Sequence, residues 1–236
     1  MNDLSILLVS LLPVAGLLYY IYRTDPIQEP VQWLAKAFFC GVAIVLPAIL
    51  VESVIQHIFF DEEGVTTIWG AVGSAFFIAA LPEEGLKLLA LWLLLRKNPY
   101  FDEHFDGIVY AVYVSLGFAA IENIGYVFGN IDDWMEVSIS RALLAVPGHY
   151  AFGVLMGYFY SNYYFINRSQ RNKRLIFLAP FLAHGIYDTF AFFGSVSPVM
   201  GGIGFVLLVI FCIRLHKYCY NQIQSHIKRD KDLYAA

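Results

Sequence analysis

The stretch LPEEGLKLLALWLLL, from Leu81 to Leu95, places two glutamates and a lysine inside one of the most apolar parts of the chain. Carboxylates in such surroundings suit general acid–base chemistry. Glu83 and Lys87 are four residues apart, so on a helix they share one face and Lys87 can neutralise Glu83. Glu84 is then left on a neighbouring face, and we expect it to be the glutamate that is free to activate water.

Three later apolar stretches carry further polar or ionisable side chains. GFAAIEN contains Glu122 and Asn123, AVPGHYAF contains His149, and LAHGIYDTF contains His184 and Asp188. His184 and Asp188 also share a helical face, so Asp188 can orient the imidazole ring or act beside it as a ligand. An ionisable group at membrane depth costs about 2.5 kcal/mol or more, which makes each of these residues a functional candidate.

These residue types support two routes of peptide-bond hydrolysis, and the sequence leaves both open. In a metal-free route, one glutamate of the EE pair activates water, while His149 or His184 binds the oxyanion or protonates the leaving amine. In a metal route, His149, His184 and one of Glu122 or Asp188 hold one zinc ion, and a glutamate is the base. The predicted catalytic set comprises Glu83, Glu84, Lys87, Glu122, Asn123, His149, His184 and Asp188.

The composition places these side chains in a membrane protein. Of the 236 residues, 59% are hydrophobic and only 14% are charged, whereas a soluble domain has about 25% charged residues. About seven apolar blocks are long enough to cross a bilayer. They lie roughly at 4–22, 34–58, 67–95, 105–128, 138–162, 175–194 and 199–216. We therefore predict an all-α polytopic helix bundle that forms one membrane domain over residues 1–236, with its third helix broken near Pro82.

Basic residues collect in alternate loops. They include Arg23, Arg96 and Lys97, and they continue in segments 168–174 and 214–231. Because cytoplasmic loops collect Lys and Arg, this alternation predicts an N-terminus outside and a C-terminus in the cytoplasm. The candidate residues then share one layer, from the midplane into the outer leaflet. We interpret the basic loops as topology signals, so the expected partner is the lipid bilayer and no nucleic acid.

Two glycine pairs have the spacing that permits close approach of membrane helices. Gly125 and Gly129 form one GxxxG pair, and Gly153 and Gly157 form the other. We interpret both pairs as packing positions rather than parts of the chemistry.

Four motifs carry a family resemblance. PEEGLK, GFAAIEN, PGH and HGIYD occur in this order, each in its own predicted span, and they resemble the PrsW family of intramembrane proteases. The resemblance covers roughly residues 68–195, the motif-bearing core. The related CAAX-processing and bacteriocin-processing group typically has EExxxR and FxxxH. This chain has Lys87 at a shorter spacing and Glu122 in place of the histidine, and both departures favour the PrsW branch.

The resemblance implies a protease of the bacterial cytoplasmic membrane that cleaves a single-pass membrane protein, such as an anti-sigma factor, near its outer face. The competing interpretation is a proton- or cation-coupled transporter, since carboxylates, histidines and a broken helix at the midplane also suit ion coupling. Inverted repeats would support transport, and we find none between the two halves of the sequence.

Overall fold

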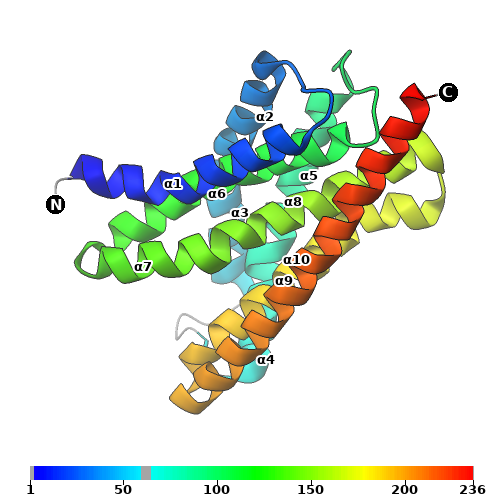
Figure 1. Ribbon diagram of the computed structural model, residues 1–236. Coiled ribbons are helices and arrows are strands. Elements are labelled where there is room, and N and C mark those ends of the chain that lie inside the picture. Colours follow the sequence, from blue (N-terminus) through cyan, green and yellow to red (C-terminus); the bar gives the residue numbers. More distant parts are fainter. Residues whose placement is uncertain (1–2, 60–64, 236) are drawn as a thin grey trace.

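The computed structural model describes residues 3–59 and 65–235, and all regular structure in these two ranges is helical (Figure 1). In chain order the helices are α1 (Asp3–Thr24), α2 (Val31–Ala43), α3 (Val45–Phe59), α4 (Ile68–Gly73), the π-helix η1 (Ser74–Ala80), α5 (Leu81–Leu95), α6 (Asp106–Gly129), the 3-10 helix η2 (Ile131–Asp133), α7 (Trp134–Ser140), the π-helix η3 (Arg141–Ala145), α8 (Val146–Ser161), the π-helix η4 (Asn162–Ile166), α9 (Gln170–Val196) and α10 (Pro198–Tyr234).

Within the described ranges these helices join into seven long rods, which confirms the prediction of a polytopic helical membrane protein. Six of the rods are long and apolar enough to cross a membrane. The remaining rod runs from Ile68 to Leu95 and differs from the others by the charges of Glu83, Glu84 and Lys87. All three of these side chains are buried, so the rod can lie in the bilayer without exposing them to lipid.

Helices α6 and α8 form the centre of the bundle. α6 packs against α1, α2 and α8, and α8 packs in addition against α9 and α10. In its most apolar 18-residue window, α6 has 78% of its residues buried, against 22% for α1 and 17% for α10. The outer helices instead turn large apolar side chains towards lipid. Polar residues on α6 and α8 are therefore enclosed by protein.

The two ends of the bundle differ in the segments they contain. The marked N- and C-termini lie at opposite ends, and the α6–α7 turn is at the N-terminal end (Figure 1). At the other end, Asp230 near the C-terminus accepts hydrogen bonds from the backbone N–H groups of His104 and Phe105, both at 2.9 Å. The linker between α5 and α6 is thus tied to the last turns of α10.

The irregularity expected beside Pro82 takes the form of a π-helix rather than a break. Residues Ser74–Ala80 are π-helical, and the N–H of Leu81 bonds to the carbonyl of Phe76, five residues back. Pro82 then stands in the first turn of α5, where the missing N–H of proline costs little. The rod continues through this point, and its next two residues are Glu83 and Glu84.

The glycine pairs divide into one that packs and one that does not. A Cβ on Gly157 would lie 2.2 Å from the carbonyl oxygen of Gly107, and one on Gly153 would lie 3.0 Å from Ser115. This pair holds α8 against α6, as predicted. The interpretation of Gly125 and Gly129 as packing positions was wrong, because a Cβ at either position would meet no other atom within 4 Å.

We expect Gly157→Ala to destabilise the protein by about 2 kcal/mol or more, since backbone on α6 would have to move. The matched change Gly125→Ala should leave stability unchanged or raise it by up to about 1 kcal/mol through helix propensity. The free energy of unfolding, measured by SDS titration in mixed micelles, checks both. Equal effects of the two changes would contradict the assigned contact between α6 and α8.

Candidate functional site

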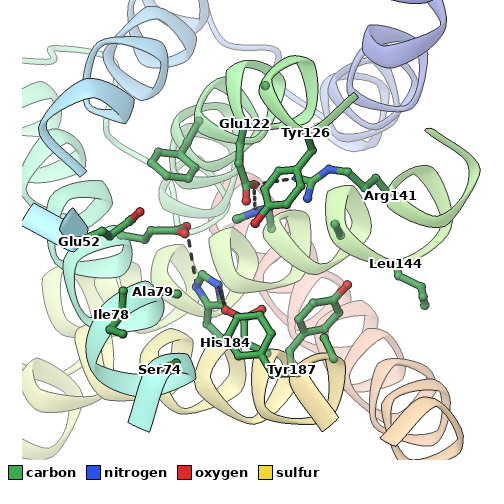
Figure 2. A pocket seen from close by; sticks show the side chains of 18 of the residues that line it. Glu52, Ser74, Ile78, Ala79, Glu122, Tyr126, Arg141, Leu144, His184 and Tyr187 are labelled. Atoms are coloured by element: carbon green, nitrogen blue, oxygen red, sulfur yellow. Dashed lines mark hydrogen bonds and ion pairs between the residues drawn. The ribbon is translucent and has the colours of Figure 1, made fainter. Parts of the chain in front are cut away.

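A cavity of about 940 Å³ lies among the helices towards the N-terminal end of the bundle. Its walls come from α3, η1, α5, α6, α7, η3, α8, α9 and α10, and its lining includes Gln56 and Asn130, near the ends of α3 and α6. Figure 2 shows Glu122, Arg141 and His184 arranged around this space. The polar residues of four rods therefore meet in one place inside the bundle.

The side chain of Lys87 is the centre of the polar network. Its Nζ atom lies 3.0 Å from Glu83 Oε2, 2.7 Å from Glu84 Oε1 and 3.1 Å from His149 Nδ1. An ammonium group has three donors and no acceptor, so each donor has one partner here. His149 Nδ1 must then accept, which places the ring proton on Nε2. All four side chains are buried.

The two glutamates differ in their access to the cavity. Glu83 lines the cavity, whereas Glu84 is fully buried, and within the described structure its Oε2 atom has no hydrogen-bond partner. The expectation that Lys87 pairs with Glu83 and leaves Glu84 free was wrong. Lys87 contacts both, because residues three and four positions apart are equally neighbours on a helix.

His149 reaches a further carboxylate through its other ring nitrogen. Its Nε2 lies 2.7 Å from Glu122 Oε2, and the same oxygen forms an ion pair with Arg141 Nη2 at 2.9 Å. Arg141 Nε donates to Asn123 Oδ1 at 2.7 Å, and Asn123 Nδ2 donates to the carbonyl of Ser10 on α1 at 2.5 Å. The network thus extends from α5 through α8, α6 and η3 to α1.

His184 lies between carboxylates from α5 and from its own helix, α9. Its Nδ1 is 2.9 Å from Glu84 Oε1, and its Nε2 is 3.1 Å from Asp188 Oδ2. The ring stacks on Phe152 with a centroid separation of 4.7 Å. Because both nitrogens face carboxylates, the imidazolium form of His184 can donate to both. The ring of His149 is 5.6 Å away, so the two histidines belong to one site.

All eight residues predicted from the sequence are members of this network. Two further residues were missed as site residues. Glu52 on α3 lines the cavity and is an acidic residue within an apolar block, the same signal that identified the others. Arg141 lies near the end of the apolar block 138–162, and its contacts with Glu122 and Asn123 depend on packing between helices.

The metal ligands expected from the sequence do not converge on one point. Glu122 is bound to Nε2 of His149 and Asp188 is bound to Nε2 of His184, and neither carboxylate belongs to the group of described residues whose ligand atoms lie within 4.8 Å of one another. Each histidine therefore faces its own carboxylate. The expected ligand set requires correction, because helical spacing alone did not show which face each ring presents.

Glu83, Glu84 and His149 instead form the group that can hold a metal ion in the part of the chain that the structure describes. One ligand atom from each lies within 4.8 Å of the other two. Two carboxylates and an imidazole suit zinc by their chemistry. The ammonium of Lys87 contacts all three residues, so it already supplies positive charge there. A metal ion can take that place only if the lysine side chain withdraws.

The fold and the site together define a polytopic membrane protein with a buried acid–base centre, the combination that hydrolysis of a peptide bond within a membrane requires. The family model described as PrsW family intramembrane metalloprotease matches residues 29–215. The chain belongs to this family and is a multi-pass bacterial membrane protease.

Similar proteins share most of their length with this chain. Protease PrsW of Oceanobacillus iheyensis is 36% identical over 228 residues, which cover 93% of this chain and 99% of that protein. Protease PrsW of Clostridioides difficile is 30% identical over 98% of this chain and 95% of its own length. Protease PrsW of Bacillus subtilis is 36% identical over 78% of this chain and 81% of its own length. No solved structure matches the chain. These findings give no support to the transporter interpretation.

We expect Lys87→Met to lower the free energy of unfolding by about 3–5 kcal/mol, because two buried carboxylates lose their positive partner. Lys97→Met, at an exposed position in the turn that follows α5, is the control and should change stability by less than about 0.5 kcal/mol. Adding Glu83→Gln and Glu84→Gln to Lys87→Met should recover much of the loss. If the losses in free energy of unfolding caused by the three changes were simply additive, that result would contradict a network centred on Lys87.

Proposed function

We propose that the protein is an endopeptidase that cleaves a single-pass membrane protein in the cavity beside Glu83, His149 and His184. The observation that supports this most strongly is the network around Lys87, which holds carboxylates and imidazoles at a cavity inside a membrane bundle. A membrane helix keeps its backbone polar groups bonded, so the substrate has to unwind locally before it is cut. Polar side chains in the cavity wall can bind the groups that unwinding frees.

Zinc is the metal ion that we propose for this site, with Glu83, Glu84 and His149 as its ligands. Their donor chemistry fits zinc, and their ligand atoms cluster within 4.8 Å. The buried Oε2 of Glu84 is a spare donor at the same place. When bound, the ion supplies a Lewis acid for the carbonyl of the scissile bond.

His184 is the residue to which we assign proton transfer. It lines the cavity and is held at its two ring nitrogens by Glu84 and Asp188. These carboxylates hold the ring as an imidazolium, which donates a proton to the leaving amine and regains one from the attacking water.

A metal-free route is the second candidate, and the position of Lys87 favours it. Its ammonium is the cation that Glu83, Glu84 and His149 contact. In this route Glu83 activates water, because it is the glutamate of the pair that lines the cavity. His184 again protonates the leaving amine.

Metal analysis and chelation distinguish the two routes. We expect the purified full-length protein to contain about one zinc ion per chain, to lose proteolysis on chelation and to regain it with zinc. Glu84→Gln should lose the ion. Glu52→Gln, a carboxylate of the same cavity outside the ligand set, should retain it. An active protein without metal would exclude the zinc route and leave the metal-free one.

We also propose that the N-terminus is outside and the C-terminus is cytoplasmic. Basic residues such as Arg96, Lys97 and Lys231 lie in the segments at the C-terminal end of the bundle, which supports this orientation. The cavity is displaced towards the N-terminal end. Together these features favour cleavage near the outer face, and the family resemblance makes an anti-sigma factor our proposed substrate class.

Mapping the cut in a single-pass anti-sigma factor by mass spectrometry tests the function and the orientation together. We expect the purified protein to cut in the outer half of the substrate span or just outside it. His184→Gln should lower turnover at least about 100-fold, whereas His57→Gln, an exposed histidine on α3, should not. A cut in the cytoplasmic half would refute the orientation, and full turnover by His184→Gln would refute the site.

A further inference from the structure

A second group of buried carboxylates lies at the C-terminal end of the bundle, away from the cavity. Asp25 and Glu29 come from the α1–α2 linker, and Asp106 begins α6. Their exposed fractions are 4%, 6% and 0%. Glu103, also buried, is a charged neighbour of both Asp25 and Glu29. Segments about eighty residues apart in sequence therefore bring several acids together.

Asp106 is the most buried of these acids, and one of its carboxylate oxygens has no hydrogen-bond partner. Its Oδ2 accepts hydrogen bonds from the backbone N–H groups of Asp102 and Glu103, at 2.9 and 2.7 Å. Its Oδ1 is buried and has no hydrogen-bond partner. The hydroxyl of Tyr110, one helical turn after Asp106 on α6, donates to Glu29, so the carboxyl groups of Glu29 and Asp106 lie near each other. Two neighbouring buried carboxyl groups repel each other unless a proton or a cation lies between them.

Glu29 and Asp25 complete the polar surroundings. The hydroxyl of Tyr110 on α6 donates to Glu29 Oε2. Asp25 Oδ1 accepts from the N–H of Ile27 at 3.2 Å, while Asp25 Oδ2 is buried without a partner. Burial raises the pKa of Asp25 to about 7 and also raises the pKa of Glu29. Both linker acids therefore resist carrying an uncompensated charge.

Among the described residues, no lysine, arginine or histidine forms an ion pair with Asp25, Glu29 or Asp106. The nearby ion pair joins His104 to Asp230 at 2.6 Å. A small pocket of about 290 Å³ lies close to the α1–α2 linker, and its lining includes Ile27, Asp230 and Lys231.

We propose that Glu29 and Asp106 bind a hard divalent cation of the Mg²⁺ class. Mg²⁺ is held in proteins by one or two carboxylates and retains several waters, which matches a site built from two acids. The unpartnered Oδ1 of Asp106 supplies a free donor atom. The ion would tie the α1–α2 linker to the start of α6, the helix that carries Glu122. This site is separate from the proposed zinc ligands.

Mn²⁺, which electron paramagnetic resonance detects directly, serves as the probe for this site. Chelator-treated full-length protein in detergent should bind one Mn²⁺ that excess Mg²⁺ displaces. Glu29→Gln and Asp106→Asn should each weaken that binding at least tenfold. Glu52→Gln, at a partly buried acid that lines the other cavity, should leave it unchanged.

The melting temperature gives a second measurement for any variant that folds poorly. Mg²⁺ should raise the melting temperature of the wild-type protein and not that of Glu29→Gln. Two results would overturn the proposal. One is wild-type protein that neither binds Mn²⁺ nor responds to Mg²⁺, and the other is Glu29→Gln that binds Mn²⁺ as tightly as wild type. Neither result bears on proteolysis, because Glu29 and Asp106 lie outside the cavity.

Discussion

The three hydrogen bonds of the Lys87 ammonium are the constraint on which the site depends. Two acceptors come from its own helix, and the third, His149, comes from α8. A buried charge that loses its partner costs several kcal/mol. The approach of α8 to α5 is therefore coupled to the ionisation of Glu83 and Glu84. The same bonds determine the tautomer of His149, and so they make its Nε2 the donor to Glu122.

Two of the four rods that supply the catalytic candidates use the same local arrangement. In each rod a π-helix is followed by a proline in the first turn of the next α-helix, and the polar residue comes one or two positions later. Pro82 precedes Glu83 and Glu84, and Pro147 precedes His149 by two residues. A π-helix shifts the register of the turns that follow it, and such segments are frequent at functional sites. In this protein they direct α5 and α8 so that their polar side chains face each other.

Charge balance separates the two polar centres of the molecule. Around the cavity, the carboxylates meet Lys87, Arg141 and two histidines, so every acid of the network has a basic neighbour. At the other end, Glu29 and Asp106 form no ion pair with a basic side chain among the described residues. A network whose acids are matched by basic groups can keep its charges inside the membrane and transfer protons. A group of acids without basic partners has to bind a cation or a proton to be neutralised.

Much of the fold was predictable from sequence, since membrane spans follow from local runs of apolar residues and from the fixed rise of a helix. The eight site residues were predictable for a related reason: ionisable groups in such runs have few causes besides function. Only the tertiary structure decided that Lys87 meets His149, that Glu52 and Arg141 reach the site, and that His149 faces Glu122. It also decided which glycine pair packs and brought Glu29 to Tyr110, one turn from Asp106. The physical reason is that helical periodicity defines neighbours three and four residues apart on one helix, whereas contacts between helices depend on how the rods pack and turn.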